Sequence, residues 1–316
     1  MGRPRDSKRA LALVAVPLTA AICTAPAAAH SAPLVAAAGD IACGPGDPDF
    51  HGGAGHADKC RQRATSRLLR GRGVDAVLPL GDLMYSPRLR FFRRIYGRTW
   101  GRLKRRTHPV LGNHDYFEGT GSARGYFDYF NGVGDHRGRA GGRGEGWYSF
   151  TLGHWHVIAL NSNCERVACG PRSPQVRWLR RDLRASRAHC TLAYFHHPLF
   201  SSGPHGNEQG VRAFWRVLYR RRADVILSGH DHLYERFAPQ TPAARLNRRR
   251  GISQFTVGTG GHSLYNFKPQ LLPNSVKRVE HRFGVLELRL RRASYSFRFR
   301  ALGGAVLDRG ARRCSR

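Results

Sequence analysis

The chain has 316 residues, of which 41% are hydrophobic, so it can bury a substantial core. Its length fits one catalytic-size domain and is short for two well-separated domains. The formal net charge is +32, and nearly all of the cations are arginine. Two explanations remain open: attraction to an anionic partner such as nucleic acid, a wall polymer or a phosphorylated substrate, or the codon bias of a GC-rich coding sequence. The charge bears on solubility and attraction, and it indicates no chemistry.

The first 29 residues have the pattern of an export signal. Arg3, Arg5, Lys8 and Arg9 form a basic start, an apolar segment too short to span a membrane follows, and small residues near Ala29 offer a cleavage site. We therefore expect a signal peptide over 1–29 and a catalytic domain over 30–316. The mature protein should be secreted, extracellular or associated with the cell wall, and should contain no transmembrane segment.

Six cysteines follow this segment, and an even number outside the cytoplasm is most simply read as three disulfides. Six cysteines allow 15 pairings. Proximity in the sequence favours two pairs and by elimination leaves the third: Cys43 with Cys60, Cys164 with Cys169, and Cys190 with Cys314. The alternative, a cysteine metal site, lacks any CxxC pair.

Hydrophobic runs of strand length alternate with helical patterns along the chain, which indicates βαβ units and a largely parallel sheet. We predict strands over 33–40, 74–82 and 107–115, with a helix over 57–73 between the first two. The segments 147–153 and 154–163 should form an antiparallel pair. Further strands are expected over 190–198, 223–232 and 252–261, and a hairpin over 283–300. Segments 119–146 and 239–251 are expected to be surface loops.

The strongest helical pattern covers 173–186. Ser173 is a suitable N-cap and Pro174 occupies the first helical position. Val176, Leu179 and Leu183 would lie on one face.

Each predicted strand runs directly into a short polar cluster. These clusters are Gly39-Asp40, Gly81-Asp82, 112–115, 196–197 and 229–232. Because ligands bind outside the carboxyl ends of strands in parallel α/β sheets, we expect the clusters to converge. They offer oxygen and imidazole donors without thiolates, a set that suits iron, manganese or zinc. A carboxylate that bridges two cations roughly 4 Å apart is what a two-metal hydrolytic site requires.

Five ordered motifs carry a family resemblance: "GDIAC" at 39–43, "GDLMY" at 81–85, "GNHD" at 112–115, "FHHP" at 195–198 and "GHDH" at 229–232. The series resembles the calcineurin-like metallophosphoesterases and, within them, the purple acid phosphatase branch. It extends from Leu34 to about Gly261, in a chain similar in size to small secreted bacterial members. The resemblance implies an α/β fold, a four-layer αββα sandwich of two mixed β-sheets flanked by helices.

The resemblance also implies a site for two metal ions. Asp40, Tyr85 and His232 would bind the first ion, and the tyrosine ligand favours Fe(III) there. Asp82 would bridge both ions.

Asn113, His196 and His230 would bind the second ion, which would be Fe(II), Zn or Mn. His230 and His232 point to the same side of an extended segment, because residues two apart share a face. His197, next to His196, is left without a defined role and would face the other way.

Three residues have implied roles in catalysis rather than in metal binding. His114 would contact the phosphate and stabilise or protonate the leaving group, with Asp115 as its supporting partner. His205 lies where some relatives carry another substrate-facing histidine, and simple exposure is the competing interpretation. Six other histidines are interpreted as structural or without a role: His51, His56, His136, His154, His156 and His262.

The function implied is that of a secreted binuclear metal-dependent phosphoesterase. It would hydrolyse phosphomonoesters of small molecules by attack of a metal-activated hydroxide on phosphorus. One alternative is a phosphodiesterase or nuclease that uses the same site, for which the basic charge is the only support. Another is a non-catalytic binder of anionic polymers, in which His114 would serve no purpose.

Overall fold

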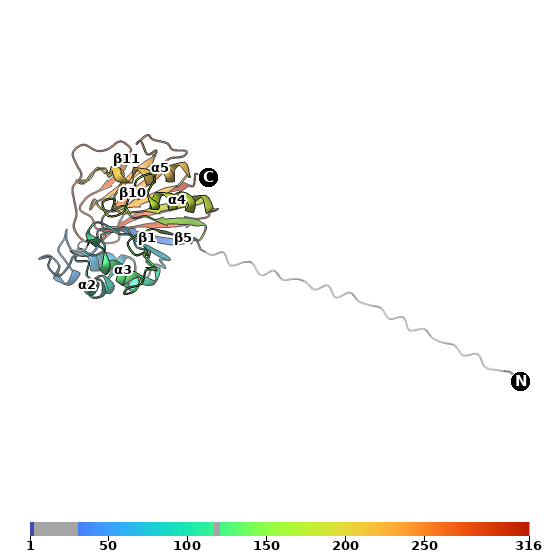
Figure 1. Ribbon diagram of the computed structural model, residues 1–316, viewed down its shortest axis with the longest axis horizontal. Coiled ribbons are helices and arrows are strands. Elements are labelled where there is room, and N and C mark those ends of the chain that lie inside the picture. Colours follow the sequence, from blue (N-terminus) through green and yellow to red (C-terminus); the bar gives the residue numbers. More distant parts are fainter. Residues whose placement is uncertain (3–30, 117–120, 316) are drawn as a thin grey trace. The chain divides into compact units, whose positions relative to one another are not determined.

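Two β-sheets pack against each other in the unit that runs from Ala32 to Arg316 (Figure 1). The computed structural model describes residues 1–2, 31–116 and 121–315, so the expected signal peptide over 1–29 falls almost wholly outside them. Within these ranges, no helix is both long enough and apolar enough to cross a membrane.

The first sheet has the strand order β14-β13-β12-β1-β2. Its strands are β1 (Leu34–Ala38), β2 (Ala76–Pro79), β12 (Gly284–Arg291), β13 (Ser294–Ala301) and β14 (Val306–Arg313). Only β1 and β2 pair in parallel, and the remaining neighbours are antiparallel. All residues of β1 and β2 are buried, as expected for continuous apolar strands covered on both faces.

The second sheet has the order β11-β9-β10-β8-β7-β6-β5. Its strands are β5 (Tyr148–Leu152), β6 (Trp155–Ala159), β7 (Cys190–Tyr194), β8 (Val225–Ser228), β9 (Tyr234–Gln240), β10 (Ile252–Val257) and β11 (Ser275–Val279). The neighbours β6, β7, β8 and β10 pair in parallel, so their carboxyl ends share one edge. A separate two-stranded ribbon joins β3 (Arg137–Gly138) to β4 (Gly141–Gly142).

Helices lie on the outer sides of the sheets (Figure 1). They are α1 (Gln62–Leu68), α2 (Leu89–Arg94), α3 (Arg124–Phe130), α4 (Pro174–Ala185) and α5 (Arg212–Arg220), with short 3-10 turns η1 (His51–Gly53), η2 (Tyr96–Arg98), η3 (Trp100–Arg106), η4 (His114–Tyr116) and η5 (Gln209–Val211). In α4, Ser173 accepts a hydrogen bond from the Val176 amide at 3.2 Å, as its N-cap role predicts. Val176, Leu179 and Leu183 are buried, which confirms the predicted apolar face.

Two apolar clusters hold the layers together. One lies between the sheets, where Phe255 of β10 and Phe297 of β13 have ring centroids 5.0 Å apart. The other joins α4 and α5 to the outer face of the second sheet. The expected mixed α/β sandwich is therefore confirmed.

Several predicted elements need correction. The segment 107–115 makes only isolated parallel bridges, from Val77 to Thr107 and from Leu80 to Val110, instead of a strand. Pro109 supplies no amide donor there. The loop expected over 119–146 contains α3 and the β3–β4 ribbon, and both β9 and β11 were unforeseen.

All three predicted disulfides are present. The pairs are Cys43–Cys60, Cys164–Cys169 and Cys190–Cys314. The last pair joins β7 of the second sheet to the chain just after β14 of the first.

Candidate metal centre

The polar residues that follow β1, β2 and β8 have an unusual backbone conformation. Asp40, Asp82 and His230 have φ values of 59°, 50° and 73°. These values lie in the left-handed region, which residues other than glycine rarely adopt. Such conformations persist only where the surrounding structure imposes them, and they gather at functional sites. All three residues were expected metal ligands.

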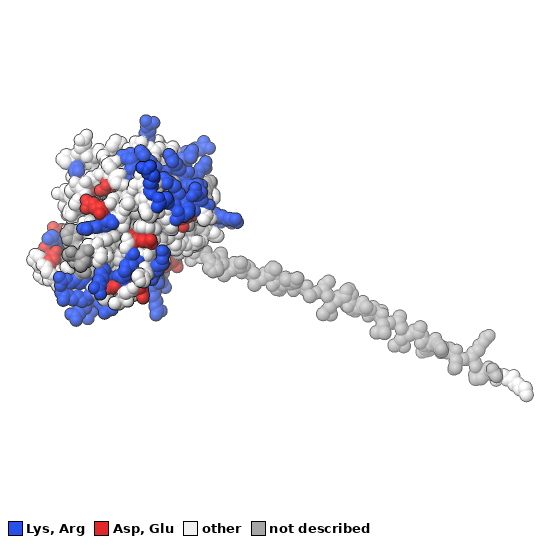
Figure 2. Space-filling view, viewed as in Figure 1, with Lys and Arg blue, Asp and Glu red and all other residues white. Residues whose placement is uncertain are grey.

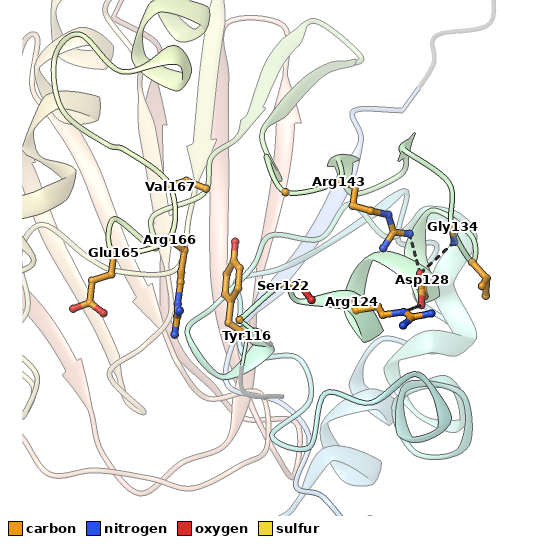
Figure 3. A pocket seen from close by; sticks show the side chains of 12 residues that line it. Tyr116, Ser122, Arg124, Asp128, Gly134, Arg143, Glu165, Arg166 and Val167 are labelled. Atoms are coloured by element: carbon orange, nitrogen blue, oxygen red, sulfur yellow. Dashed lines mark hydrogen bonds and ion pairs between the residues drawn. The ribbon is translucent and has the colours of Figure 1, made fainter. Parts of the chain in front are cut away.

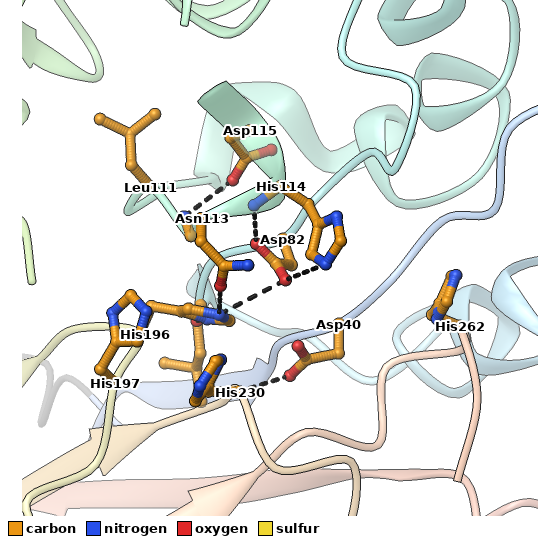
Figure 4. A network of polar contacts seen from close by, with 12 residues as sticks. Asp40, Asp82, Leu111, Asn113, His114, Asp115, His196, His197, His230 and His262 are labelled. Atoms are coloured by element: carbon orange, nitrogen blue, oxygen red, sulfur yellow. Dashed lines mark hydrogen bonds and ion pairs between the residues drawn. The ribbon is translucent and has the colours of Figure 1, made fainter. Parts of the chain in front are cut away.

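Asp82 lies at the centre of a polar network (Figure 4). Its Oδ2 is 3.4 Å from His196 Nε2, and its Oδ1 accepts a hydrogen bond from the His114 amide at 2.8 Å. His196 Nε2 is also 3.1 Å from Asn113 Oδ1, while His196 Nδ1 lies 2.8 Å from the Leu80 carbonyl. The carbonyl fixes the ring so that Nε2 faces Asp82 and Asn113.

The second half of the network gathers around Asp40. Its Oδ1 is 3.2 Å from His232 Nε2 and 3.4 Å from the Tyr85 hydroxyl, and the last two groups are 2.9 Å apart. Its Oδ2 accepts a hydrogen bond from the His230 amide at 2.9 Å. The structure thus brings together all seven expected metal ligands.

Two groups of residues in the network, one of which includes His197, have the donor chemistry and spacing to hold cations. The ligand atoms of Asp40, Asp82 and His196 lie within 4.8 Å of one another, and so do those of His196, His197 and His230. Buried carboxylates and imidazoles suit iron, zinc or manganese. The residues present therefore fit two adjacent metal ions.

Burial and mutual proximity set the charges of these ligands. Burial and the neighbouring His196 and His197 lower the pKa of His230 well below its usual value. Although burial opposes ionisation of Asp82, the nearby His196 holds its pKa below the usual range. Burial likewise opposes protonation of His196, but Asp82 raises the His196 pKa to about 9. A cation at this position would displace that proton, because ligands bind metals in their deprotonated forms.

Close backbone approach around Asp82 requires glycine. A Cβ on Gly112 would overlap the Asp82 carboxylate, and one on Gly81, which has a φ of 90°, would lie 2.5 Å from His196 Nδ1. The glycines before the polar clusters thus let the loops approach one another.

His262 contacts the centre although no role was expected for it from the sequence. Its ring stacks on Tyr85 with centroids 3.4 Å apart and planes 8° apart. Burial and the nearby His232 lower the His262 pKa to about 3. Burial and Asp82 raise the pKa of Tyr85 well above normal, so a cation would be needed to ionise the phenol. His262 follows β10 only after the glycine-rich segment 258–261, so the pattern of polar residues directly after strands did not identify it.

His197 also has a defined environment. Its ring is buried, its Nδ1 lies 2.9 Å from Ser162 Oγ, and its centroid is 4.5 Å from that of His230. It therefore faces the expected second-metal ligands instead of turning away from them.

The three expected catalytic residues lie at different depths. The His114 side chain is 36% exposed, with Nε2 4.0 Å from Asp82 Oδ2, at the rim of the network. His205 is exposed, and its ring stacks on His230 at 4.2 Å.

Asp115 is fully buried, and its described hydrogen bonds come from backbone amides, at 3.1 Å from Leu83 and 2.9 Å from Gly112. Burial and the neighbouring Asp82 raise its pKa to about 8. These bonds tie the loop after β2 to the loop that carries Asn113 and His114, so Asp115 positions the backbone of the site.

A cleft of about 410 Å³ opens beside the network at Asn113 and His197. Tyr116, Glu165 and Arg166 also line it, and the same three residues border a larger pocket of about 750 Å³ that contains none of the expected ligands. Figure 3 shows Tyr116 between Glu165 and Arg166 on one side and a pair of arginines on the other. Those two arginines, Arg124 and Arg143, already pair with Asp128.

Comparisons with known proteins find relatives among the purple acid phosphatases. Fe(3+)-Zn(2+) purple acid phosphatase 12 of Arabidopsis thaliana is 26% identical over 255 residues, which cover 71% of this chain and 53% of the relative. Purple acid phosphatase 21 of the same plant is 31% identical over 166 residues, or 48% of this chain and 36% of the relative. The chain thus spans about half the length of these relatives or less.

Solved structures share the fold. The purple acid phosphatase PPD1 of yellow lupin (Lupinus luteus) superposes with a TM-score of 0.72 at 18% identity and covers 89% of this chain and 53% of its own. GAP50, described as the anchor in the inner membrane complex of Plasmodium, gives a TM-score of 0.65 at 16% identity and covers 90% of both chains.

The model of the calcineurin-like phosphoesterase family matches residues 35–234, a span that contains every expected metal ligand from Asp40 to His232. The sequence relatives belong to the purple acid phosphatase branch of that family. The chain is therefore a member of the calcineurin-like phosphoesterase family.

Proposed function

We propose that this protein hydrolyses phosphomonoesters at a centre of two metal ions. The observation that carries the proposal is the convergence of two ligand groups on one spot, with Asp82 between Asp40 on one side and His196 on the other. When bound, two cations supply the positive charge that polarises phosphate oxygens and lowers the pKa of a water molecule.

The metal assignments follow the donor set. Asp40, Tyr85 and His232 would hold the first ion, and the phenolate favours Fe(III) there. Asn113, His196 and His230 would hold Fe(II), Zn or Mn. The printed name of the Arabidopsis relative, an Fe(3+)-Zn(2+) enzyme, supports this pairing. The His197 ring lies 4.5 Å from the His230 ring, so it would influence how His230 binds the second metal ion.

The groups at the rim would act on the substrate. His114 is partly exposed beside Asp82, so its imidazole can face the leaving group and donate a proton to it. Burial lowers the pKa of His114, an effect that the nearby Asp82 partly offsets. The bonds of Asp115 to the Leu83 and Gly112 amides would hold that loop in register. His205 would contact the phosphate from the side of His230.

The cleft beside Asn113 and His197 offers room for the organic part of a small phosphorylated molecule. Arg166 supplies a cation there, and Glu165 and Glu208 supply anions. A phosphodiester substrate is the second candidate, and the net charge of +32 is the observation that favours it. We also propose that the protein is secreted, as the basic and apolar pattern over 1–29 and the three disulfides support.

Hydrolysis of an aryl phosphate monoester beside a bis-aryl diester, each with and without chelator, tests the proposal. We expect chelator-sensitive turnover of the monoester well above that of the diester. A higher rate on the diester would select the second candidate. Absence of turnover on both, in protein shown by elemental analysis to carry two metal ions, would refute a hydrolytic role.

A further inference from the structure

One of the groups of cationic side chains on the face shown in Figure 2 covers two neighbouring helices, and another lies over the region of α2 and α3. Figure 2 shows a continuous patch of lysine and arginine over the region where Figure 1 places α4 and α5. The two helices pack against each other on the outer face of the second sheet. Each helix, with the residues just after it, contributes five arginines: Arg177, Arg180, Arg181, Arg184 and Arg187 from the first, and Arg212, Arg216, Arg220, Arg221 and Arg222 from the second. We call these ten residues the arginine face.

The arginine face carries almost no compensating negative charge. Asp182 is the one acidic residue within the two segments, and its carboxylate bonds to Ser149 Oγ and His156 Nε2, both at 2.6 Å. Among the described residues, none of these arginines makes an ion pair. The local interactions of Arg180, Arg212 and Arg222 include bonds to backbone carbonyls, which leave their charge unneutralised.

This charge opposes the stability of the helices that carry it. Arg177 and Arg181 are four residues apart in α4, as are Arg212 and Arg216 in α5. Like charges at this spacing repel each other and destabilise a helix. A bound polyanion would relieve that repulsion, so the arrangement favours a partner dense in negative charge.

The surroundings of the face point to a phosphate polymer. The exposed large apolar residues of the described chain are Met1, Val133, Leu246, Leu271, Val276 and Val306, and none lies on α4 or α5. An amphipathic membrane surface requires apolar side chains that could enter the lipid. Guanidinium groups bind phosphate oxygens through paired hydrogen bonds. The aromatic side chains of the two helices, such as Trp178 and Tyr219, are only partly exposed, so they offer no open platform for stacking single-stranded bases.

We propose that the arginine face binds the phosphate backbone of duplex DNA without reading its sequence. The two helices precede β7 and β8 in the chain, and none of the ten arginines lines the cleft beside Asn113 and His197. Bound DNA would therefore anchor the protein and would leave the metal centre open to small substrates. This surface is independent of the proposed hydrolytic function.

The test uses the mature protein with a fluorescent duplex of about 30 base pairs, in chelator so that the probe stays intact. A five-site variant replaces exposed arginines that have no described side-chain hydrogen bond or ion pair: Arg177→Gln, Arg181→Gln, Arg184→Gln, Arg216→Gln and Arg220→Gln. A matched control makes the same charge change on another surface: Arg93→Gln, Arg94→Gln, Arg98→Gln, Arg102→Gln and Arg105→Gln.

We expect the first variant to bind DNA on the order of 10²- to 10⁴-fold more weakly at about 0.1 M salt. Its slope of log K against log salt should fall by about one for each phosphate that the variant no longer neutralises. The control should bind less than about threefold more weakly than wild type. A third variant, with lysine at the first five sites, should keep most of the affinity, because the cations remain.

Turnover of an aryl phosphate and thermal unfolding, measured on the same variants, report folding and the metal centre separately. Both should remain near wild type. Equal reductions of DNA affinity in the two glutamine variants would overturn the proposal, because net charge alone would then explain binding. Binding to vesicles of anionic phospholipid in preference to DNA would overturn it as well.

Discussion

Asp82 is the carboxylate that links the two halves of the candidate metal centre. The potential ligand atoms of Asp82, Asp40 and His196 lie within 4.8 Å of one another. The described contact of the Asn113 side chain, in contrast, is with His196. We expect Asp82→Asn to weaken both metal positions and Asn113→Ala to empty chiefly the second. Elemental analysis of the purified variants measures this difference. Wild-type metal content in Asp82→Asn would refute the bridging role.

His114 is the residue on which the catalytic proposal depends most directly. Its ring is at the rim of the network and outside both ligand groups, so His114→Ala should keep both metal ions. Turnover should fall roughly 10²- to 10⁴-fold, the range typical of general acid–base residues. The reduction should be smaller for nitrophenyl esters, whose leaving groups need less protonation.

Two results would contradict this role of His114. Loss of metal from His114→Ala would show that it is a ligand. Full activity of the variant on alkyl phosphates would show that no proton from His114 is needed.

The sequence predicted the location of site residues that belong to recognisable motifs better than that of site residues outside such motifs. Asp40, Asp82 and His230 were expected to converge because each lies shortly after a buried strand, and the structure brings them together in one network. His262 also follows a strand, β10, but the glycine-rich segment before it allows many paths. Its stacking on Tyr85 depends on how the two loops meet, which neighbouring residues alone do not determine.

At the scale of elements, long apolar strands and the capped helix α4 were predictable, and short irregular segments were not. Residues 107–115 have a short apolar run at 109–111, yet Pro109 and the approach of Gly112 to Asp82 limit the segment to isolated bridges. The helix α3 lies in a segment that glycine and arginine made look like a loop. Its aromatic residues Tyr126, Tyr129 and Phe130 pack against Phe92 of α2, so tertiary packing stabilises this helix.

The disulfide Cys190–Cys314 fastens the end of the first sheet to the second. It closes 124 residues, against 5 for Cys164–Cys169. Loop-closure entropy then predicts a decrease of about 5 kcal/mol in unfolding free energy when Cys190 and Cys314 become serine, and about 2 kcal/mol for the shorter pair. Denaturant unfolding of the two double variants measures the difference. A decrease that is equal or larger for Cys164 and Cys169 would contradict the account.

For the whole molecule, buried neutral histidines should make the metal-free protein sensitive to acid. Burial and the nearby Arg139 lower the pKa of His108 to about 4. Burial lowers the pKa values of His197 and His262 to about 3, with His196 and His232 as the respective neighbours that add to the effect. In the unfolded chain each histidine titrates near 6.5. Their contribution to stability is therefore present above about pH 6.5 and is lost as the pH falls toward 4.

Two other groups limit the pH window in which this effect can be measured. The His196 pKa is raised to about 9, so below about pH 6.5 that ring is protonated in both states and adds no slope. Asp115, with a pKa raised to about 8, acts in the opposite direction, because only the folded state holds its proton between about pH 8 and 4. Burial also raises the pKa values of Asp224 and Glu235, which act in the same direction as Asp115, and it lowers those of His230 and His114, which add to the effect of the three histidines.

Chemical denaturation in the presence of chelator, at several pH values from 6.5 to 5, isolates this effect, because most carboxylates titrate below that range. Each additional proton that is fully bound on unfolding changes the free energy of unfolding by about 1.4 kcal/mol per pH unit. The free energy of unfolding should therefore decrease across the window. His108→Gln should flatten the decrease by the share of one histidine, because His108 stacks on Phe150 away from the metal centre and titrates independently. Stability that stays constant or rises between pH 6.5 and 5 would show that these rings are protonated in the folded protein.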